Sequence, residues 1–463
     1  MSAAQRSDAL ILFGITGDLS KKKLIPALYR LAEADRLPER VIGVARSEWS
    51  LDELRTHMRA ALKAADVEVD HEAFGRLSDR LGFVQGDYQD AATFGRVAEA
   101  VEGCELPVFY FAIPPDLFDD VIGGLVANGL HERSRVVLEK PFGRDLDSAR
   151  ALNELLQRHF PESSIFRIDH FLGKEAVQNL MVFRFANTIL DPVWNRYYVD
   201  NVQITLAEDF GIEGRGRFYD EVGALRDVVQ NHLLQVVALL AMEPPATDDA
   251  EALRDEIAKV IRAIRPFDPA DVVRGQVEGY RDEEGVAPDS DTETFVALRA
   301  YVDSWRWADV PWYIRAGKSM ASTVTEAVVE LKRPPRPMFS GATEAPTPNR
   351  LRFRMKPDDL ITLNMQAKRP GEELASMPVA LLLQEQPHLD ELRLGAYDRL
   401  LDDALDGDPR LFSRADAVDA AWRAVQPVLD DPSPVVPYAP GSWGPQEADR
   451  LVPGSTWNPC TTE

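Results

Sequence analysis

One histidine, His232, lies in an apolar segment that also carries several polar side chains. Polar groups in a buried segment lower stability unless a partner or a ligand satisfies them, and four surround this histidine: Asp227, Gln230, Asn231 and Gln235. Oxidising an alcohol by hydride transfer requires removal of the hydroxyl proton, and histidine has the side chain whose unperturbed pKa suits this step near neutrality. His232 is therefore a candidate base, with Asp169 as the candidate carboxylate that orients it. A satisfied core histidine would give the same local pattern.

A second segment, residues 166–175, brings a histidine and a lysine to the predicted end of a strand. If a helix begins near Phe171, His170 and Lys174 are four residues apart and face the same side of its first turn. Together with the positive end of the helix, these two side chains would form a local anion site. A capped helix with an exposed lysine is the alternative interpretation.

A third segment places two glycines, Gly14 and Gly17, at a strand-to-helix turn. Glycines at such a turn let the backbone approach a pyrophosphate, which meets free amide groups and the positive helix end. The spacing is Gly-x-x-Gly, which also fits an ordinary tight turn. Arg46 follows the next predicted strand, where a cation accommodates a 2′-phosphate and so favours NADP over NAD. A solvated surface arginine is the alternative there.

The elements that must position these residues change in character halfway along the chain. Up to about residue 169, short apolar runs alternate with amphipathic stretches, which indicates a parallel, doubly wound sheet of the Rossmann type. The predicted strands are 9–13, 41–45, 106–112, 135–138 and 164–168, and the predicted helices are 19–31, 88–101, 116–127 and 146–159.

Beyond Gly173, strand-like runs follow one another without regular helices between them. This pattern favours an α+β domain with a large, mainly antiparallel sheet. The predicted elements are strands at 199–207, 294–302, 324–331, 350–355 and 360–365 and one long helix at 220–241. We therefore expect two domains, a cofactor-binding domain at 1–170 and a substrate-binding and oligomerisation domain at 171–463.

Composition excludes several classes of function. The 463 residues include 52 Lys+Arg and 76 Asp+Glu, a formal net charge of −24 that disfavours nucleic acids and anionic membranes as partners. Any anionic ligand must therefore be held by a local basic pocket. We see no export signal and no apolar stretch long enough to span a bilayer. Two cysteines exclude a disulfide framework, which fits a cytoplasmic protein.

Five motifs occur together in this chain. They are Gly14-Ile-Thr-Gly-Asp-Leu-Ser-Lys21, Glu139-Lys-Pro-Phe-Gly143, Arg167-Ile-Asp-His-Phe-Leu-Gly-Lys-Glu175, Glu213-Gly-Arg-Gly216 and Arg226-Asp-Val-Val-Gln-Asn-His232. In combination they resemble the NADP-dependent, bacterial-type glucose-6-phosphate 1-dehydrogenase family, from about Ala9 to Trp443. The resemblance implies oxidation of glucose 6-phosphate at C1 to 6-phosphogluconolactone with hydride transfer to NADP, the first step of the oxidative pentose phosphate pathway.

The resemblance also implies roles for individual residues. His232 would be the general base and Asp169 its carboxylate partner. His170 and Lys174 would hold the sugar phosphate, and Glu208, Asp227 and Lys318 would complete the sugar site. The cofactor site would comprise Gly14, Ile15, Thr16, Gly17, Asp18, Leu19, Ser20, Lys21, Arg46, Asp87, Tyr88 and Lys140. A cis peptide is expected between Lys140 and Pro141.

Two departures from the family pattern affect the predicted site. Ile15 and Thr16 replace the more usual Ala-Ser in the glycine turn. Thr323 stands where relatives often carry a second Lys or Arg near the substrate, so we expect Lys356 to compensate; a surface lysine is the alternative.

Relatives pair through the large sheet, so the resemblance also implies a homodimer or homotetramer. It implies only the catalytic cofactor site, because the chain lacks the longer C-terminal extension with which animal relatives hold a structural NADP. No ligand cluster in the sequence implies a metal ion. Two classes of function remain as alternatives. The first is a related enzyme that oxidises free glucose or uses NAD or a deazaflavin as cofactor. The second is a catalytically weak protein that senses NADP or sugar phosphate.

Overall fold

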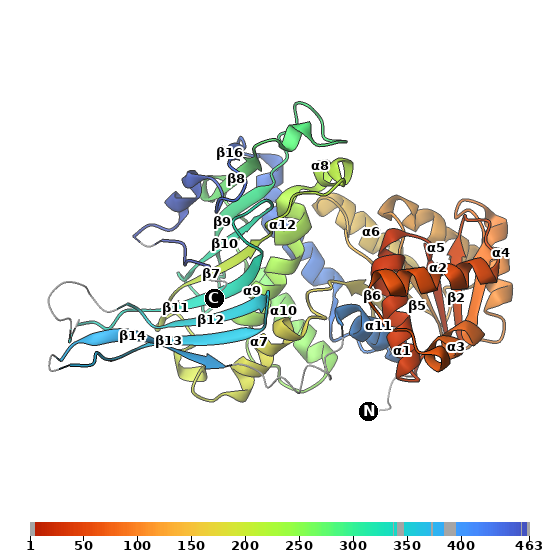
Figure 1. The fold of residues 1–463 in the computed structure, drawn as a ribbon, viewed down its shortest axis with the longest axis horizontal. Coiled ribbons are helices and arrows are strands. Elements are labelled where there is room, and N and C mark those ends of the chain that lie inside the picture. The colour runs from red at the N-terminus through yellow and green to blue at the C-terminus, as the bar shows by residue number, and fades with distance from the viewer. Residues whose placement is uncertain are drawn as a thin grey trace. The chain divides into compact units, whose positions relative to one another are not determined.

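The computed structural model describes residues 5–336, 338–339, 347–371, 374–383, 395–454 and 456–460 (Figure 1). The chain forms two compact units. The first comprises Met1–Glu175, Pro245–Asp255 and Leu394–Asp419, and the second comprises Ala176–Pro244, Glu256–Arg393 and Ala420–Glu463. The sequence analysis expected two continuous domains, at 1–170 and 171–463. It did not foresee that two later segments of the chain belong to the first unit.

The first unit is built on a parallel sheet with the strand order β3-β2-β1-β4-β5-β6. The strands are β1 (Ala9–Phe13), β2 (Arg40–Ala45), β3 (Leu81–Gln85), β4 (Pro107–Phe111), β5 (Arg135–Leu138) and β6 (Ile165–Ile168). A short strand, β15 (Phe412–Ser413), joins β6 antiparallel. This is the doubly wound order of a Rossmann-type domain, so the predicted fold of this half is confirmed.

Helices cross over between these strands and bury the sheet. They are α1 (Ile25–Glu33), α2 (Leu51–Ala64), α3 (His71–Arg80), α4 (Ala91–Ala100), α5 (Phe118–Ala127) and α6 (Leu146–His159), with α11 (Ala396–Asp406) added from the later part of the chain. Every residue of β1 and β4 is buried, as expected for strands covered on both faces. The segment between β2 and α4, which the sequence patterns left unassigned, supplies α2, α3 and β3.

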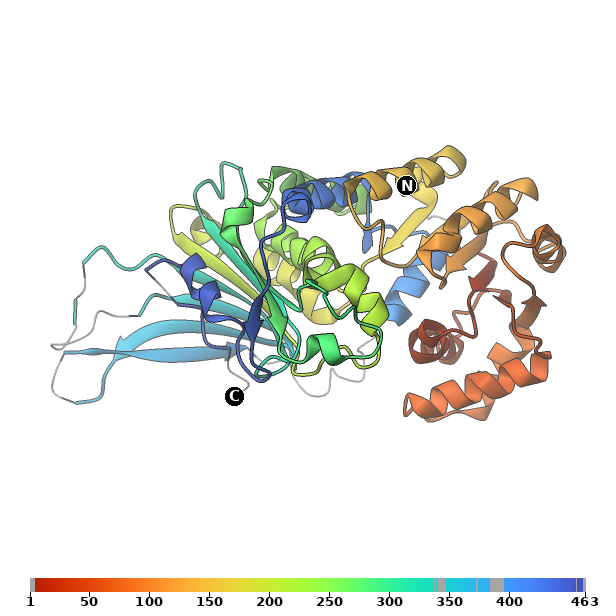
Figure 2. The same cartoon turned by 90° about the horizontal axis from the view of Figure 1, so that it is seen from above.

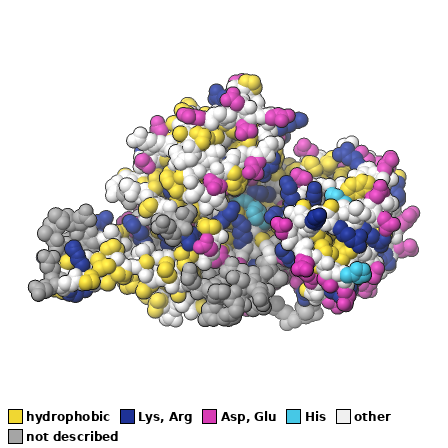
Figure 3. Space-filling view, in the orientation of Figure 1, with side chains coloured by type: hydrophobic (Ala, Val, Ile, Leu, Met, Phe, Trp, Pro, Cys, Tyr) yellow, Lys and Arg dark blue, Asp and Glu magenta, His cyan; other side chains and the backbone are white. Residues whose placement is uncertain are grey.

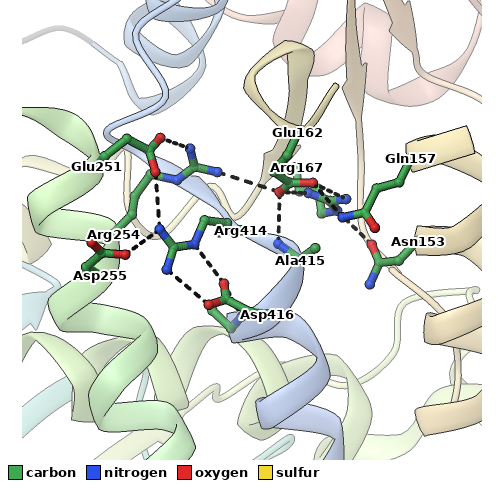
Figure 4. A network of polar contacts seen from close by, with 11 residues as sticks. Asn153, Gln157, Glu162, Arg167, Glu251, Arg254, Asp255, Arg414, Ala415 and Asp416 are labelled. Atoms are coloured by element: carbon green, nitrogen blue, oxygen red, sulfur yellow. Dashed lines mark hydrogen bonds and ion pairs between the residues drawn. The ribbon is translucent and has the colours of Figure 1, made fainter. Parts of the chain in front are cut away.

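A network of buried charges fixes β6 within the first unit (Figure 4). The guanidinium of Arg167 donates from Nη1 to Glu162 Oε1 at 2.7 Å, from Nη2 to Glu162 Oε2 at 3.2 Å and from Nε to Asn153 at 3.1 Å. Glu162 also accepts the backbone N–H of Ala415 at 3.0 Å, and its Oε1 lies 3.8 Å from Arg254. Because buried charges destabilise a fold unless they are paired, this network ties segments that are distant in the sequence to the strand that leads to Asp169.

The second unit is built on a nine-stranded sheet with the order β14-β13-β12-β11-β7-β10-β9-β8-β16. The strands are β7 (Val199–Ala207), β8 (Val272–Val277), β9 (Phe295–Tyr301), β10 (Pro311–Gly317), β11 (Val324–Leu331), β12 (Arg350–Lys356), β13 (Leu360–Lys368), β14 (Ser376–Leu383) and β16 (Val436–Tyr438). All neighbours are antiparallel except the β7–β10 and β8–β16 pairs. The predicted large, mainly antiparallel sheet is confirmed.

The long helix predicted at 220–241 is wrong as a single element. The structure has α8 (Gly216–Ala224), a π-helix (Leu225–Leu233) and α9 (Leu234–Ala241). Gly223 has a φ of 65°, and a Cβ there would lie 2.6 Å from Glu293 Oε1, so glycine permits both the turn and the close approach. The apolar periodicity alone does not show this break. Figure 2 shows these helices along one face of the sheet.

The remaining helices in the described part of the chain are α7 (Glu175–Ala186), α10 (Ala250–Ala263) and α12 (Ala415–Asp430). Short helical turns lie at Ser20–Leu24, Pro115–Leu117, Glu162–Ser164, Asp191–Val193, Pro269–Asp271, Tyr280–Asp282 and Gln446–Leu451. Among the described residues, none of the helices has the length and apolar character needed to cross a membrane.

Candidate active site

The glycine turn after β1 forms a cradle at the point where the strand order reverses. Gly14 has a φ of 85°, and a Cβ there would lie 2.2 Å from the carbonyl oxygen of Ala112 after β4. Its backbone N–H donates to Val44 at 2.9 Å, and its carbonyl accepts Ser20 Oγ at 2.8 Å. Only glycine fits this position, and the turn leads directly into a helix. These features fit a dinucleotide pyrophosphate.

The two departures in this turn differ in their environment. Ile15 is fully buried and fills the space above Gly43, where a Cβ would lie 2.7 Å from Ile15 Cγ2. Its side chain therefore belongs to the core, and only its backbone is available to a cofactor. Thr16 is partly exposed, and Asp18 forms an exposed ion pair with Lys22 at 3.4 Å. Leu19, Ser20 and Lys21 lie in the first turn of the helix.

At the carboxyl ends of β2 and β3, three more predicted cofactor residues come together. Arg46 Nη1 lies 3.8 Å from Asp87 Oδ2, and both side chains are largely exposed. Tyr88 donates its hydroxyl to Val44 at 3.0 Å, and burial raises its pKa to about 12, so it remains a neutral donor. The exposed guanidinium at this edge fits a 2′-phosphate, since its present partner is a single exposed carboxylate.

The strand end after β5 carries Glu139 and Lys140. The peptide between Lys140 and Pro141 is cis, as the sequence analysis predicted, and the Lys356–Pro357 peptide is cis as well. Glu139 is buried and accepts hydrogen bonds from the hydroxyl of Tyr110 at 2.5 Å and from that of Tyr397 at 3.5 Å. Burial raises the pKa of the Glu139 carboxyl to about 7, although both phenols oppose this shift.

The segment after β6 is a turn, and the predicted helix start near Phe171 is wrong, because α7 begins at Glu175. The carboxylate of Asp169 is almost fully buried and accepts the backbone N–H of Phe171 at 3.0 Å, which fixes the turn. The Lys174 ammonium lies 3.5 Å from the centre of the Phe171 ring. The ring of His170 stacks on Tyr397, with 6.3 Å between centroids and 14° between planes. The turn thus places His170 and Lys174 immediately before a helix N-terminus, where an anion is favoured.

In the second unit, Glu208 and Lys318 meet because β7 and β10 run parallel. Ala207 pairs with Gly317 in this register, so the residues that follow lie side by side. The Lys318 ammonium donates to Glu208, and the lysine is 5% exposed. The backbone closes the same turn, since Glu208 N–H donates to Gly317 and Met320 N–H donates to Glu208. An ion pair between a buried lysine and a partly exposed glutamate at paired strand ends can hydrogen-bond sugar hydroxyl groups through both partners.

Lys356 and Lys318 both lie near the ring of Phe210. The Lys356 ammonium is 6.0 Å from the centre of the Phe210 ring, and the Lys318 ammonium is 5.3 Å from that ring. The Thr323 hydroxyl instead donates to the Asp209 carboxylate and accepts the Asp209 backbone N–H. Whether Lys356 takes the place of the missing cation stays a prediction.

His232 lies in the π-helix, which packs against β10. It is 3% exposed, and its backbone N–H donates to Asn231 Oδ1 at 2.6 Å. Asn231 in turn donates to the Arg226 carbonyl at 3.3 Å, so side chains supply contacts that a regular helix would make through its backbone. Among the described residues, the buried Gln235 Oε1 has no hydrogen-bond partner. Such wide turns often occur at functional sites, and this one explains why polar residues cluster in an apolar segment.

The structure also brings in aromatic residues that the sequence analysis did not single out. Phe210 lies under two ammonium groups, and the Tyr219 ring is 5.6 Å from Lys318. Charges near the Tyr219 phenol include Asp227 and Glu208, and burial raises its pKa well above the usual value. Tyr397 stacks on His170. No spacing rule identifies these contacts, because each joins segments far apart in the chain.

Two family models together match most of the chain. The model described as the NAD binding domain of glucose-6-phosphate dehydrogenase matches residues 11–179, and the model for its C-terminal domain matches residues 181–458. The glucose-6-phosphate 1-dehydrogenase 1 of Mycobacterium tuberculosis is 43% identical over 469 residues, which cover 99% of this chain and 98% of the relative. The enzyme of Mycolicibacterium smegmatis is 44% identical over 479 residues and 97% of each chain.

Solved structures agree with these matches. The crystal structure of glucose-6-phosphate 1-dehydrogenase from Mycobacterium avium has a TM-score of 0.89 and 45% identity, covering 98% of this chain and 99% of its own. A structure described as glucose-6-phosphate dehydrogenase in complex with its substrate glucose-6-phosphate has a TM-score of 0.89 and 35% identity over the whole of both chains.

Proposed function

The chain belongs to the glucose-6-phosphate dehydrogenase family, and from this premise we propose how its residues carry out the reaction. The protein oxidises D-glucose 6-phosphate at C1 to 6-phospho-D-glucono-1,5-lactone and transfers the hydride to NADP, the first step of the oxidative pentose phosphate pathway. The observation that carries this conclusion is the whole-chain match to a structure described as a complex with glucose 6-phosphate.

His232 takes the proton of the C1 hydroxyl, and Asp169 is its carboxylate partner. Removing this proton lets the C1 oxygen form a carbonyl as the hydride leaves the carbon. Two observations support these roles: the Asp169 carboxylate is fixed by the Phe171 N–H, and His232 is buried on a wide helical turn whose backbone is held by the Asn231 side chain. The charge of Asp169 stabilises the imidazolium that forms.

The substrate is held by its phosphate and by its hydroxyl groups. His170 and Lys174 bind the phosphate at the start of α7, where the helix end favours an anion. Glu208, Asp227 and Lys318 bind the sugar, and the ion pair of Glu208 and Lys318 supports this assignment. Lys174 and Lys318 supply the local positive charge that a protein with a net charge of −24 requires to bind an anionic substrate.

The cradle of Gly14–Lys21 would hold the cofactor, together with Arg46, Asp87, Tyr88 and Lys140. When bound, NADP supplies the acceptor for the hydride. Gly14 keeps the backbone close enough for its amide groups to hold the pyrophosphate. Arg46 binds the 2′-phosphate and thereby favours NADP over NAD.

Lys356 replaces the cation that relatives carry at the position of Thr323. We expect Lys356→Ala to raise the KM for glucose 6-phosphate by roughly five-fold, because an ammonium contact with a charged group contributes about 1 kcal/mol at a partly exposed site. Steady-state kinetics at saturating NADP would measure this change. Thr323→Arg in the Lys356→Ala background should recover most of the affinity.

Lys368 supplies the matched control for this experiment. It is an exposed lysine on the neighbouring strand β13, and its ammonium hydrogen-bonds the Arg369 and Gly371 carbonyl groups. Lys368→Ala should leave the KM unchanged. An unchanged KM in Lys356→Ala would show that Lys356 is a surface lysine.

A direct test of the reaction is the identity of its product. Incubation of the purified protein with glucose 6-phosphate and NADP should yield one reduced cofactor for each phosphogluconolactone or its hydrolysis product, measured by absorbance and mass spectrometry. Reduced cofactor without a phosphorylated lactone or acid would contradict oxidation at C1.

The protein forms a homodimer or homotetramer through the outer part of the nine-stranded sheet. β14 is its edge strand, and Figure 3 shows hydrophobic side chains gathered over this part of the surface. Five large apolar residues there are more than a third exposed: Met365, Leu374, Leu381, Leu382 and Leu383. Exposed apolar side chains on both faces of an edge strand, in a protein with this much charge, support an interface between copies.

Leu382→Glu should weaken this assembly, because a buried unpaired carboxylate is costly at an interface core. We expect light scattering after size-exclusion chromatography to show a shift toward monomer at micromolar concentration. Val69→Glu changes an exposed valine of the first unit and should leave the mass unchanged. An identical assembly mass in wild type and Leu382→Glu would contradict the proposed interface.

We also propose that the protein acts in the cytoplasm. Both cysteines, Cys104 and Cys460, are free thiols, which suits a reducing compartment.

A further inference from the structure

Glu139 is a buried carboxylate for which the reaction described above has no use. We propose that it is a positioning residue for the phosphate end of the substrate site, acting through Tyr397 on the imidazole of His170. This inference rests on the proposed function, because His170 is taken there as a phosphate ligand.

A continuous set of contacts in the first unit leads from the core to this histidine. The Tyr110 hydroxyl, on the fully buried strand β4, donates to Glu139 Oε1 at 2.5 Å. The Tyr397 hydroxyl, near the start of α11, donates to Glu139 Oε2 at 3.5 Å. The Tyr397 ring then stacks on His170 at 6.3 Å with only 14° between the planes. Glu139 thus fixes the ring whose face sets the position of the imidazole.

The topology explains why this carboxylate reaches the site. β5 and β6 are parallel neighbours, with Leu138 paired to Arg167. Glu139 and Asp169 directly follow the ends of these two strands, so both residues lie at the carboxyl ends of neighbouring parallel strands. Arg167 is itself held by Glu162 and Asn153, which makes β6 a firm reference for the turn that carries His170 (Figure 4).

The contacts of Glu139 depend on its protonation. The ionised carboxylate accepts a hydrogen bond from both phenol hydroxyl groups. The protonated carboxyl carries a hydrogen on one oxygen, so that oxygen no longer accepts well from the phenol that faces it. The groups that face it are Tyr110 from β4, Tyr397 from α11, Lys140 on its own segment and Asp169 after β6. Burial raises the pKa of Glu139 to about 7, and Asp169 adds to this shift, while the two phenols and Lys140 oppose it. The longer bond, to Tyr397, is the one that protonation weakens.

Glu139→Gln tests this role because glutamine keeps the volume but presents an amide N–H₂ to one of the phenols. Steady-state kinetics at saturating NADP should show a KM for glucose 6-phosphate that is raised roughly five- to ten-fold at about pH 8.5, with a smaller change in kcat. The ratio of variant to wild-type KM should fall toward one at about pH 6, because wild-type Glu139 is then protonated. This ratio cancels the ionisation of the substrate phosphate, and a purely structural role would not make it depend on pH.

Asp403→Asn supplies the matched control. Asp403 lies on the same helix as Tyr397, and burial raises its pKa to about 7 as well, but the charged groups around it are Asp402, Asp406, Asp408 and Arg399. Its KM ratio should stay near one across the same pH range. A pH-dependent ratio in this variant would assign the effect to the helix and overturn the role of Glu139.

Tyr397→Phe keeps the inference testable even if Glu139→Gln does not fold. It should raise the KM to a similar extent, and adding Glu139→Gln to it should cause no further increase, since Glu139 acts through Tyr397. A Glu139→Gln ratio that is below two-fold or constant with pH, or additive effects of the two changes, would overturn the inference. Absence of turnover by the wild-type protein would instead overturn the proposed function, so the two failures are distinguishable.

Discussion

His232→Asn should lower kcat for glucose 6-phosphate oxidation by about a thousand-fold, within the range expected for loss of a general base. Asparagine retains a polar side chain of similar reach but cannot take a proton from the C1 hydroxyl near neutral pH. The KM for glucose 6-phosphate should change by less than about three-fold, because His170, Lys174 and Lys318 carry most of the substrate binding in this account. Initial rates of cofactor reduction, with the melting temperature measured in parallel, would check this result.

His159→Asn is the matched control for this change. His159 lies in the last turn of α6 in the first unit and belongs to none of the residues assigned to the site. Its replacement should leave kcat and both KM values unchanged. More than a tenth of the wild-type kcat in His232→Asn would contradict the assignment of His232 as the base.

Arg46→Ser should raise the KM for NADP by roughly thirty-fold, corresponding to about 2 kcal/mol for the loss of a charge-assisted contact with the 2′-phosphate. The KM for NAD should change little, because NAD lacks this phosphate. The present partner of Arg46 is an exposed carboxylate at 3.8 Å, so removing the arginine leaves no buried charge unpaired and should not affect folding. Steady-state kinetics with both cofactors would measure the change in preference.

Arg59→Ser is the matched control, because Arg59 is also an exposed arginine of the first unit. Arg59 lies on helix α2, and its guanidinium is 4.2 Å from the centre of the Phe74 ring. It should leave the ratio of the two cofactor KM values unaltered. If Arg46→Ser raised the KM for NAD and the KM for NADP by the same factor, Arg46 would not be a ligand of the 2′-phosphate.

The fold could be predicted from the sequence where local patterns and topology agree. Fully apolar runs such as residues 107–111 are typical of parallel strands covered on both faces, and they form the centre of the first sheet. The helix at 220–241 failed because apolar periodicity does not reveal a π-helix or a break at Gly223. That break depends on Glu293, which is distant in the sequence and accepts the Leu225 N–H at 3.0 Å.

The sequence predicted those parts of the candidate site that depend on local structure, and it missed those that depend on contacts between distant segments. Motif residues such as Gly14 carry a local signal, because the turn they form needs a positive φ and a close backbone approach. The helix start near Phe171 was wrong because Asp169 caps a turn with its own side chain and delays the helix to Glu175. Phe210 and Tyr397 gave no signal, since their contacts with Lys318 and His170 arise only when separate strands and helices come together.

Oxidation of glucose 6-phosphate with NADP is tested by measuring reduced-cofactor production by the purified protein in four mixtures, glucose 6-phosphate or glucose with NADP or NAD. We expect rapid turnover of glucose 6-phosphate with NADP, weak turnover when either phosphate is missing, and loss of turnover in His232→Asn. Binding of NADP and glucose 6-phosphate without turnover in any mixture would contradict the proposed oxidation and would identify the protein as a sensor of these ligands.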